Sequence, residues 1–474
     1  MVNIFEAMPI SEIKKIKQSY FPLSITMLLI PFLLLLPSLL IFINKLTTKR
    51  GKLPPGPPKL PILGNLHQLG PSPHRSTWQL SKKHGPIMLL QLRSTPTLVV
   101  SSAEAAKEVL KTHDLECCSR PPLTGPKRTL LSYPTDITGE MRKICVAELF
   151  SMKRVQSFQS VREEEVDLLI ESVSESATSA NPVDLSKYFF SLTASIIFRI
   201  AFGKQFQESQ LDNHELQKVV FEAETMLGSF CASDFFPYVG KVIDWFTHFH
   251  RKLEISFHEL DAVFQQVIDD HLDSGPTKHD EEDIVNVLLR MEKDQTQNDS
   301  IQLTKDHIKA ILMDIFVAGI HTGAITMIWA MTELVRKPTA MKKAQNEIRS
   351  CIRKKGKLTE NYVIVLLAPR ETISQIKIGN YDICPKTRIA GQHIELLPFG
   401  AGRRICPGMN MGMAVLELAL ANLLYCFYWK LPSGMTEMDI DMEEEVSITV
   451  GKKFPLMLMP INYNMWEDDE IKHC

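Results

Sequence analysis

The sequence has little of what marks several large classes of protein. Its 53 lysines and arginines nearly balance 55 aspartates and glutamates, and the net charge of −2 argues against nucleic acid as a main partner. It shows no internal repeat, and its nine cysteines follow irregular spacing with no zinc-type pair. A disulfide framework is therefore excluded, at least one thiol is free, and a reducing, cytosol-facing compartment fits best.

Charge is missing from one long apolar run near the N-terminus, residues 21–43. At 1.5 Å per residue, a helix of this run would be about 34 Å long, enough to cross a bilayer. Pro31 and Pro37 would kink it, which membrane helices tolerate. Four basic residues follow the run where a signal peptide would have a small-residue cleavage site, so we expect an uncleaved anchor. Lysines on both sides leave its orientation open.

The rest of the chain follows a stiff spacer. Four prolines among residues 53–58 lock the backbone and remove N–H donors. We therefore expect an N-terminal extension (1–20), the membrane helix (21–43), a basic, proline-rich hinge (44–60), a globular body (61–464) and an acidic tail (465–474).

Hydrophobic periodicity predicts that the body is mainly α-helical with small β-sheets. Strands are expected at 86–92, 96–101 and 454–460. Helices are expected at 103–112, 140–150, 155–174, 185–202, 214–229, 241–271 and 281–292. A further helix, capped by Thr304 and ended before Pro338, would be about 48 Å long and almost wholly apolar in its middle, so it should run through the core.

One short segment, residues 399–408, carries most of the chemical information. It sets Cys406 among glycines and two arginines, directly before an apolar run (409–427) that predicts a buried helix. Near a helix N-terminus, backbone N–H groups and the helix dipole should lower the pKa of the thiol and favour the thiolate. The glycines would let backbone approach a large flat group, and arginine pairs bidentately with carboxylates. These residue types suit a haem with a cysteine axial ligand; the alternative is a buried core cysteine beside a tight turn.

This segment matches the Phe-x-x-Gly-x-Arg-x-Cys-x-Gly signature of the cytochrome P-450 superfamily at every defined position. From Leu53 to about Asn462 the chain resembles plant microsomal members, especially those that oxidise terpenoids. The resemblance implies the cytochrome P-450 fold, with haem b between a long central helix and the cysteine loop. It also implies roles for particular residues: Cys406 as the axial thiolate on the iron, Phe399, Gly402 and Gly408 in the loop, and Arg404, Arg370 and Arg142 as partners of the haem propionates. For each arginine the alternative is a surface ion pair.

A second segment, residues 318–322, stands in the middle of the long helix. Gly319 weakens the helix and Thr322 can bond back to the preceding turn, so the helix could widen locally and turn a hydroxyl toward a ligand. The alternative is that Gly319 only allows a neighbouring helix to pack closely, and that the Thr322 hydroxyl bonds to the backbone of its own helix. The segment resembles the oxygen-activation motif of the family and implies a catalytic role for Thr322 and Gly319. His321 replaces the acidic residue of that motif; it can relay protons but carries no permanent negative charge.

The chain also departs from the family pattern. Thr138 stands in place of a tryptophan, and the Glu-x-x-Arg and Pro-x-Arg-Phe motifs are absent between residues 340 and 398. In the family these motifs form a buried ion-pair network that positions the cysteine loop. Glu333 and Arg336 have the spacing of the first motif, but their place at a helix end predicts an ordinary surface pair. The body thus looks truncated around residues 359–391, through mis-splicing, an imperfect gene model or a decaying gene.

The resemblance implies a haem-thiolate monooxygenase, anchored in the lipid of the endoplasmic reticulum membrane with its catalytic domain facing the cytosol. It would take electrons from an NADPH-cytochrome reductase and insert one atom of O₂ into a small hydrophobic, terpenoid-like metabolite. Two alternatives stay open. The missing network favours a haem-deficient or catalytically dead derivative. The lost acidic residue beside Thr322 is compatible with a haem-thiolate rearrangement enzyme that needs neither O₂ nor reductase.

Overall fold

The computed structural model describes residues 52–463, apart from 71, 94, 120–134, 204–221, 223–231, 237–238, 275–281, 296–301, 356–369, 373, 392–398, 401 and 447–448. The predicted membrane helix, the N-terminal extension, the acidic tail and nearly all of the helix predicted at 214–229 lie outside the described residues.

The chain divides into two units. Residues 54–379 and 383–474 make up the large unit, and residues 1–53 and 380–382 the small one. Among the described residues of the small unit, the backbone N–H of Lys52 donates to the Asp382 carboxylate at 3.0 Å. The N–H of Asp382 donates in turn to the Lys52 carbonyl at 2.9 Å.

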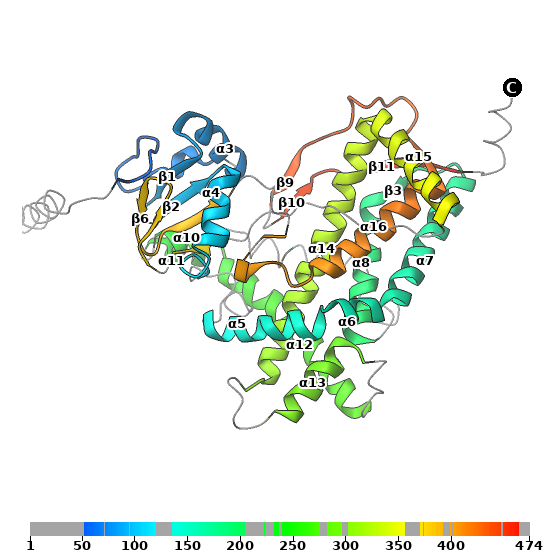
Figure 1. The fold of residues 1–474 in the computed structure, drawn as a ribbon, viewed down its shortest axis with the longest axis horizontal. Coiled ribbons are helices and arrows are strands. Elements are labelled where there is room, and N and C mark those ends of the chain that lie inside the picture. The colour runs from blue at the N-terminus through cyan, green and yellow to red at the C-terminus, as the bar shows by residue number, and fades with distance from the viewer. Residues whose placement is uncertain are drawn as a thin grey trace, which may run out of the picture. The chain divides into compact units, whose positions relative to one another are not determined.

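The large unit is mainly helical, as predicted (Figure 1). Its helices are α3 (Pro73–His84), α4 (Ala103–Lys107), α5 (Thr135–Ile144), α6 (Met152–Ser157), α7 (Gln159–Thr178), α8 (Leu185–Phe202), α10 (Ala232–Phe235), α11 (Val239–Phe246), α12 (Phe249–Ser274), α13 (Ile284–Asp294), α14 (Lys305–Arg336), α15 (Pro338–Lys355) and α16 (Met409–Cys426). Single π-helical turns follow α4 and α5, at Glu108–Thr112 and Cys145–Leu149.

The strands are short and form small sheets. They are β1 (Ile87–Leu92), β2 (Thr95–Val100), β3 (Val183–Asp184), β4 (Arg370–Glu371), β5 (Ile376–Ile378), β6 (Tyr381–Ile383), β7 (Arg388–Gly391), β8 (Phe427–Lys430), β9 (Glu444–Val446), β10 (Val450–Lys452) and β11 (Met457–Asn462). One sheet has the order β1-β2-β7-β4, with β2 and β7 parallel. A second has the order β3-β11-β8, and β9 pairs with β10 as an antiparallel hairpin.

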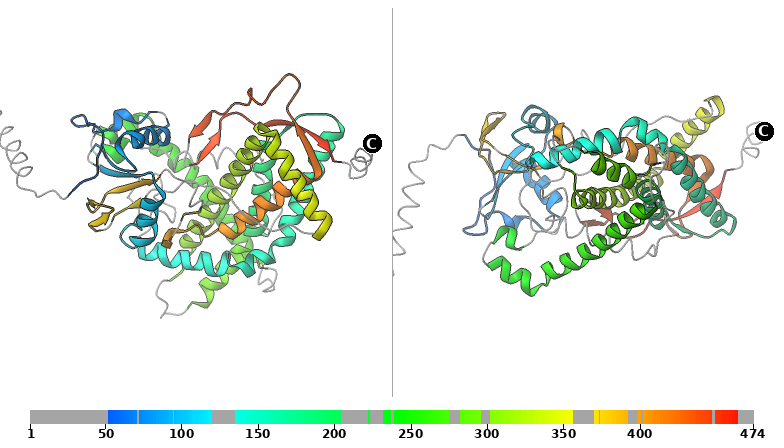
Figure 2. Two further views of the ribbon diagram at one scale, coloured as in Figure 1. Left: turned by 45° about the horizontal axis from the view of Figure 1, so that its top comes forward. Right: turned by 90° about the horizontal axis from the view of Figure 1, so that it is seen from below.

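The core is built around α14. This 32-residue helix begins after Thr304, whose hydroxyl accepts a hydrogen bond from the N–H of His307, and it ends before Pro338 as predicted. It packs against α8 and α16, which lie beside it in both turned views (Figure 2). The ring of Phe316 meets those of Phe198 and Phe264, with centroids 5.3 and 5.7 Å away. Among the described helices, α8, α14 and α16 are apolar and long enough to span a membrane by composition alone, but 67% of the α8 window and 56% of the α14 window are buried inside the molecule.

Two predicted helices are interrupted. The helix predicted at 155–174 is divided between α6 and α7, which Phe158 separates. The helix predicted at 241–271 is broken between α11 and α12, because His248 has a φ of 55° and cannot continue a right-handed helix. The late strand begins at Met457 rather than at residue 454, where it pairs with β8 and β3.

Truncating the central aromatic side chain should destabilise the protein strongly. Phe316 is 2% exposed, so Phe316→Ala should lower the free energy of unfolding by about 3–5 kcal/mol through lost burial and a residual cavity. Urea denaturation followed by tryptophan fluorescence measures this. Leu168→Ala is the control, since Leu168 is 49% exposed and its loss should cost less than about 0.5 kcal/mol. Equal effects of the two substitutions would contradict the placement of the core.

Candidate functional site

Cys406 lies just before the first turn of α16, as the sequence predicts. The helix begins at Met409 with Gly408 as its N-cap residue. The N–H of Cys406 donates to the Phe399 carbonyl at 2.8 Å, and this bond closes the loop. Gly400 and Gly402 have φ values of 72° and 68°, a region that side chains with a Cβ rarely adopt. The glycines therefore supply the left-handed backbone conformations that this loop contains.

The electrostatics of Cys406 differ from the prediction. Burial raises the pKa of the Cys406 thiol, while a hydrogen bond from the Gly408 backbone and the charge of Arg142 lower it without outweighing burial. The donors that favour a thiolate are thus present, but the predicted net decrease in the pKa is wrong for the thiol alone. A bound metal ion would favour the thiolate at Cys406, because a coordinating thiol is deprotonated outright.

The loop is held by the segment from Leu110 to Cys118. The Asp114 carboxylate accepts a hydrogen bond from the N–H of Arg403 at 2.9 Å and lies 3.7 Å from Nε of the same residue. Nε of Arg404 donates to the Cys118 carbonyl at 3.0 Å. A Cβ on Gly402 would lie 2.3 Å from the Leu110 carbonyl oxygen. Gly402 therefore makes room for protein backbone, which corrects the prediction that it does so for a flat ligand. Nothing in the sequence pattern indicated Asp114.

The three predicted propionate partners are described to different degrees. Arg142 is half-buried in α5, and its charge lowers the pKa of the Cys406 thiol, so it lies near the loop. Arg404 is part of the loop, and burial lowers the pKa of its guanidinium. Arg370 pairs through its backbone with Ile389 of β7, but its side chain lies outside what the structure describes.

The segment of α14 that was predicted to be catalytic is regular. The Thr322 hydroxyl donates to the Ala318 carbonyl at 2.6 Å, and a Cβ on Gly319 would lie 2.7 Å from Cδ1 of Ile197 in α8. The helix is α-helical from Lys305 to Arg336. The predicted widening is therefore absent from this described segment: Gly319 packs against α8, and the Thr322 hydroxyl bonds to its own helix.

Side chains on one face of the same segment are nevertheless exposed. Ala318 is exposed although Val317 and Ile320 are buried, and Thr322 is only partly buried. His321 is half-buried beside it. The neighbouring helices therefore leave this part of α14 accessible, although the residues on either side are buried.

The arrangement around Cys406 fits a large flat group held by a thiolate. The cysteine is partly exposed, and a Cβ on Gly408 would meet nothing within 4 Å. The helix that follows, α16, packs against α14, which contributes the open stretch at Ala318 and Thr322. Cationic Arg142 suits an anionic substituent on such a group.

The Glu-x-x-Arg spacing at the end of α14 belongs to a surface cluster. Glu333 lies 3.3 Å from Arg336 and 2.8 Å from Lys337, and all three side chains are at least 35% exposed. This confirms the prediction of an ordinary surface pair.

The carboxylate of Glu417 in α16 is buried. Both of its oxygens are inaccessible to solvent and have no hydrogen-bond partner in the described part of the chain. Such a group costs about 1–3 kcal/mol or more.

Comparisons with known proteins agree with this geometry. The chain matches the family model described as Cytochrome P450 over residues 54–365 and 384–457. Cytochrome P450 71B19 of Arabidopsis thaliana is 46% identical over 494 residues, which cover 91% of this chain and 98% of the relative. Cytochrome P450 71B36 of the same plant is 44% identical over 480 residues, 89% of this chain and 96% of the relative. An alignment of 494 residues is longer than this chain of 474, so the relative contains residues that this chain lacks.

Removing the carboxylate that holds the loop should weaken retention of a thiolate-bound group. Asp114→Ala deletes the acceptor of the Arg403 N–H, a charged hydrogen bond of about 1.5–3 kcal/mol. We expect bound haem per purified protein to fall several-fold. Glu116→Ala is the control, because Glu116 is 36% exposed and 4.0 Å from its partner His113. Haem content that is equal in the two variants would refute the bracing role of Asp114.

Replacing the unpartnered acid should stabilise the protein. Glu417→Leu removes two buried oxygens that lack hydrogen bonds, so the free energy of unfolding should rise by about 1–3 kcal/mol. Thermal unfolding followed by circular dichroism gives the difference. The same substitution at Glu437, which is exposed, should change little; a destabilised Glu417→Leu variant would show that this carboxylate has a partner.

Proposed function

This chain belongs to the cytochrome P450 family, and on that premise we propose that it inserts one oxygen atom of O₂ into a small hydrophobic, terpenoid-like metabolite. The family consists of haem-dependent monooxygenases, oxidoreductases in which a cysteine thiolate holds the iron. The observation that carries the proposal is the place of Cys406, at the start of α16, with the Gly408 N–H directed to its sulfur. Bound haem supplies the activation of oxygen.

In this proposal the chain holds and orients the haem. Cys406 would provide the thiolate that binds the iron, and Arg142, Arg404 and Arg370 would pair with the propionates. Arg404 would exchange its hydrogen bond with the Cys118 carbonyl for a carboxylate, which is favourable because a charged acceptor binds guanidinium more strongly. Phe399 supports the loop, since its ring lies 3.8 Å from where a Cβ on Gly412 would be.

Thr322 would hold a proton-carrying water at the open stretch of α14. Its hydroxyl donates to the Ala318 carbonyl and keeps two lone pairs that accept hydrogen bonds. The donated bond fixes the side chain rotamer, so those lone pairs have a defined direction. We assign His321, one residue earlier and half-buried, to relay protons toward this water.

We further propose an NADPH-cytochrome reductase as the electron donor. Lys143 and Arg403 are exposed on the elements that carry Arg142 and Cys406, so cationic side chains are available to an acidic partner near the loop. The hydrophobic run at residues 21–43 would anchor the chain in the endoplasmic reticulum membrane, followed by the hinge at 44–60 and the catalytic body at 61–464.

A haem-deficient derivative is the second candidate. It is favoured by Glu417, which has no hydrogen-bond partner among the residues that the structure describes, and by the interruption of the family match at residues 366–383. In that case the chain would retain the fold and the loop without binding haem.

Spectroscopy distinguishes the candidates. Reduced membranes that contain the protein should show the thiolate-type Soret shift with CO, and Cys406→Ala should abolish it. Cys384→Ala is the matched control, because Cys384 is an exposed free cysteine. Absence of haem absorbance in the unmodified protein would sink the monooxygenase proposal and leave the haem-deficient derivative. If haem binds, consumption of NADPH and O₂ with added reductase separates a monooxygenase from a rearrangement enzyme.

A further inference from the structure

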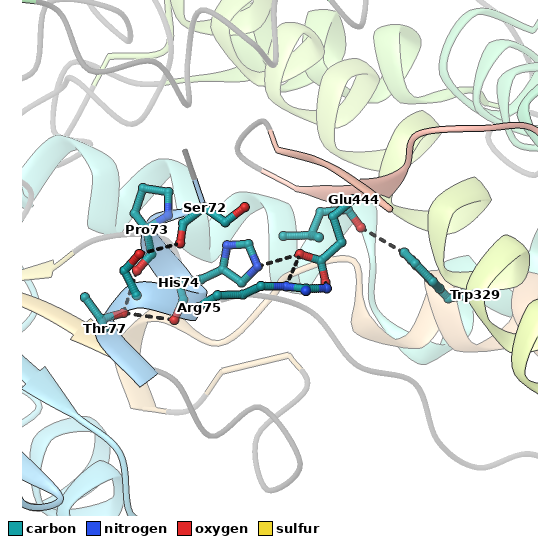
Figure 3. Close-up of polar contacts among 9 residues, drawn as sticks. Ser72, Pro73, His74, Arg75, Thr77, Trp329 and Glu444 are labelled. Carbon is teal, nitrogen blue, oxygen red and sulfur yellow. Dashed lines mark hydrogen bonds and ion pairs between the residues drawn. The ribbon is translucent and has the colours of Figure 1, made fainter. Parts of the chain in front are cut away.

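Two neighbouring residues of α3, His74 and Arg75, bind the carboxylate of Glu444 in the distant strand β9. Nε and Nη2 of Arg75 donate to the two oxygens of Glu444 at 2.9 and 2.7 Å, and Nε2 of His74 donates to the same carboxylate at 2.8 Å (Figure 3). The Glu444 side chain is only 19% exposed. Arg75 and Glu444 are 369 positions apart in the sequence, so this contact joins the two ends of the catalytic body.

The hairpin that contains Glu444 also contacts the central helix. β9 pairs with β10, with Glu444 opposite Lys452 and Val446 opposite Val450. The indole Nε1 of Trp329 in α14 donates to the Val450 carbonyl at 2.9 Å, and a Cβ on Gly451 would lie 3.5 Å from Cδ1 of Ile325. The hairpin is therefore held by α3 through β9 and by α14 through β10.

The α14 residues that contact the hairpin lie on the same face of the helix as Ala318 and Thr322. Ala318, Thr322, Ile325 and Trp329 follow the spacing of a single helix face. The first two are exposed or partly exposed, whereas Ile325 is 9% exposed and lies against β10. Ile325 is about 4.5 Å further along the axis than Thr322. The hairpin therefore covers this face of α14 from Ile325 onward, one turn beyond Thr322.

Resting on the proposed function, we propose that Arg75, His74 and Glu444 form a clamp that positions the β9–β10 hairpin as the end wall of the substrate groove. The clamp would determine how large a molecule the groove holds beside the haem. Arg75, His74 and Glu444 are positioning residues, because they act through the hairpin and do not touch the reacting atoms.

The charge state of the clamp supports this role. Burial raises the pKa of Glu444, but the hydrogen bonds and charges of Arg75 and His74 outweigh it, and the pKa lies below its ordinary value. The carboxylate is therefore ionised at neutral pH and accepts all three bonds. Surface ion pairs usually contribute little; this one is bidentate, has a second donor and is partly buried, which makes it stronger.

Two nitrogen ligands of haem iron test the clamp by their difference in size. We expect Glu444→Gln and Arg75→Gln each to weaken 4-phenylimidazole binding by about fivefold or more, while imidazole stays within about twofold, as a displaced wall loses contact only with the phenyl group. Difference spectroscopy measures both dissociation constants. The double variant should be no weaker than either single variant, because the two residues act as one unit.

Glu443→Gln is the matched control. Glu443 is in the same hairpin and pairs with Lys453 at 2.6 Å, but both side chains are more than half exposed. It should leave the ratio of the two dissociation constants unchanged. If Glu444→Gln also leaves that ratio within about twofold of the unmodified protein, the clamp is overturned.

Hydrogen exchange separates this inference from the proposed function. If imidazole causes no spectral change in the unmodified protein, the haem assignment fails, and the clamp is then judged by the backbone amides of residues 444–453 in the full chain. Faster exchange in Glu444→Gln than in Glu443→Gln supports the clamp, and equal exchange overturns it.

Discussion

The burial of α14 is the constraint on which the rest of the structure depends. This helix is 32 residues long and is covered by α8, α12, α13, α15, α16 and β10. A helix that is apolar on nearly all sides must be enclosed, so its neighbours are placed by the need to cover it. The exception is the stretch at Ala318 and Thr322, and the proposed chemistry is located at that exception. The cysteine helix and the clamped hairpin both take their positions from contact with α14.

The helix that follows Cys406 is held at both ends by segments distant in sequence. At its start, Asp114 and the Cys118 carbonyl hold Arg403 and Arg404. At its end, where helix carbonyls lack partners within the helix, Arg349 donates to the carbonyls of residues 424, 425 and 427, and Gln345 also donates to the carbonyl of residue 427 at 2.9 Å. The guanidinium also lies over the rings of Tyr428 and Tyr463, 4.3 and 3.6 Å from their centroids. The cysteine loop therefore keeps anchors that do not depend on the missing ion-pair network.

Local features were predictable and long-range ones were not. The bounds of α8 and α14 and the place of Cys406 follow from caps, prolines and apolar periodicity within a single stretch of chain. The two-residue strands β3 and β4 exist only through pairing with distant strands, so no local pattern predicts them. The hydrogen bonds between Arg75 and Glu444 join residues at opposite ends of the sequence and are equally unpredictable from a local pattern. Gly402 shows a second limit of prediction from the sequence. Its need for space was predictable, but the neighbour that requires the space was not, because Leu110 reaches it only in the folded chain.

Two features near the cysteine helix act on stability in opposite directions. Glu417, whose buried oxygens have no hydrogen-bond partner among the described residues, lowers stability by about 1–3 kcal/mol out of a total of about 5–15 kcal/mol, while the Asp114–Arg403 contact stabilises the loop by a similar amount. A group that binds only the folded chain adds stability according to its affinity and concentration. For a chain that lacks residues present in a relative, haem would therefore act as a structural component as well as a cofactor. The loop at Cys406 and the fold around α14 would then be maintained by the same binding event.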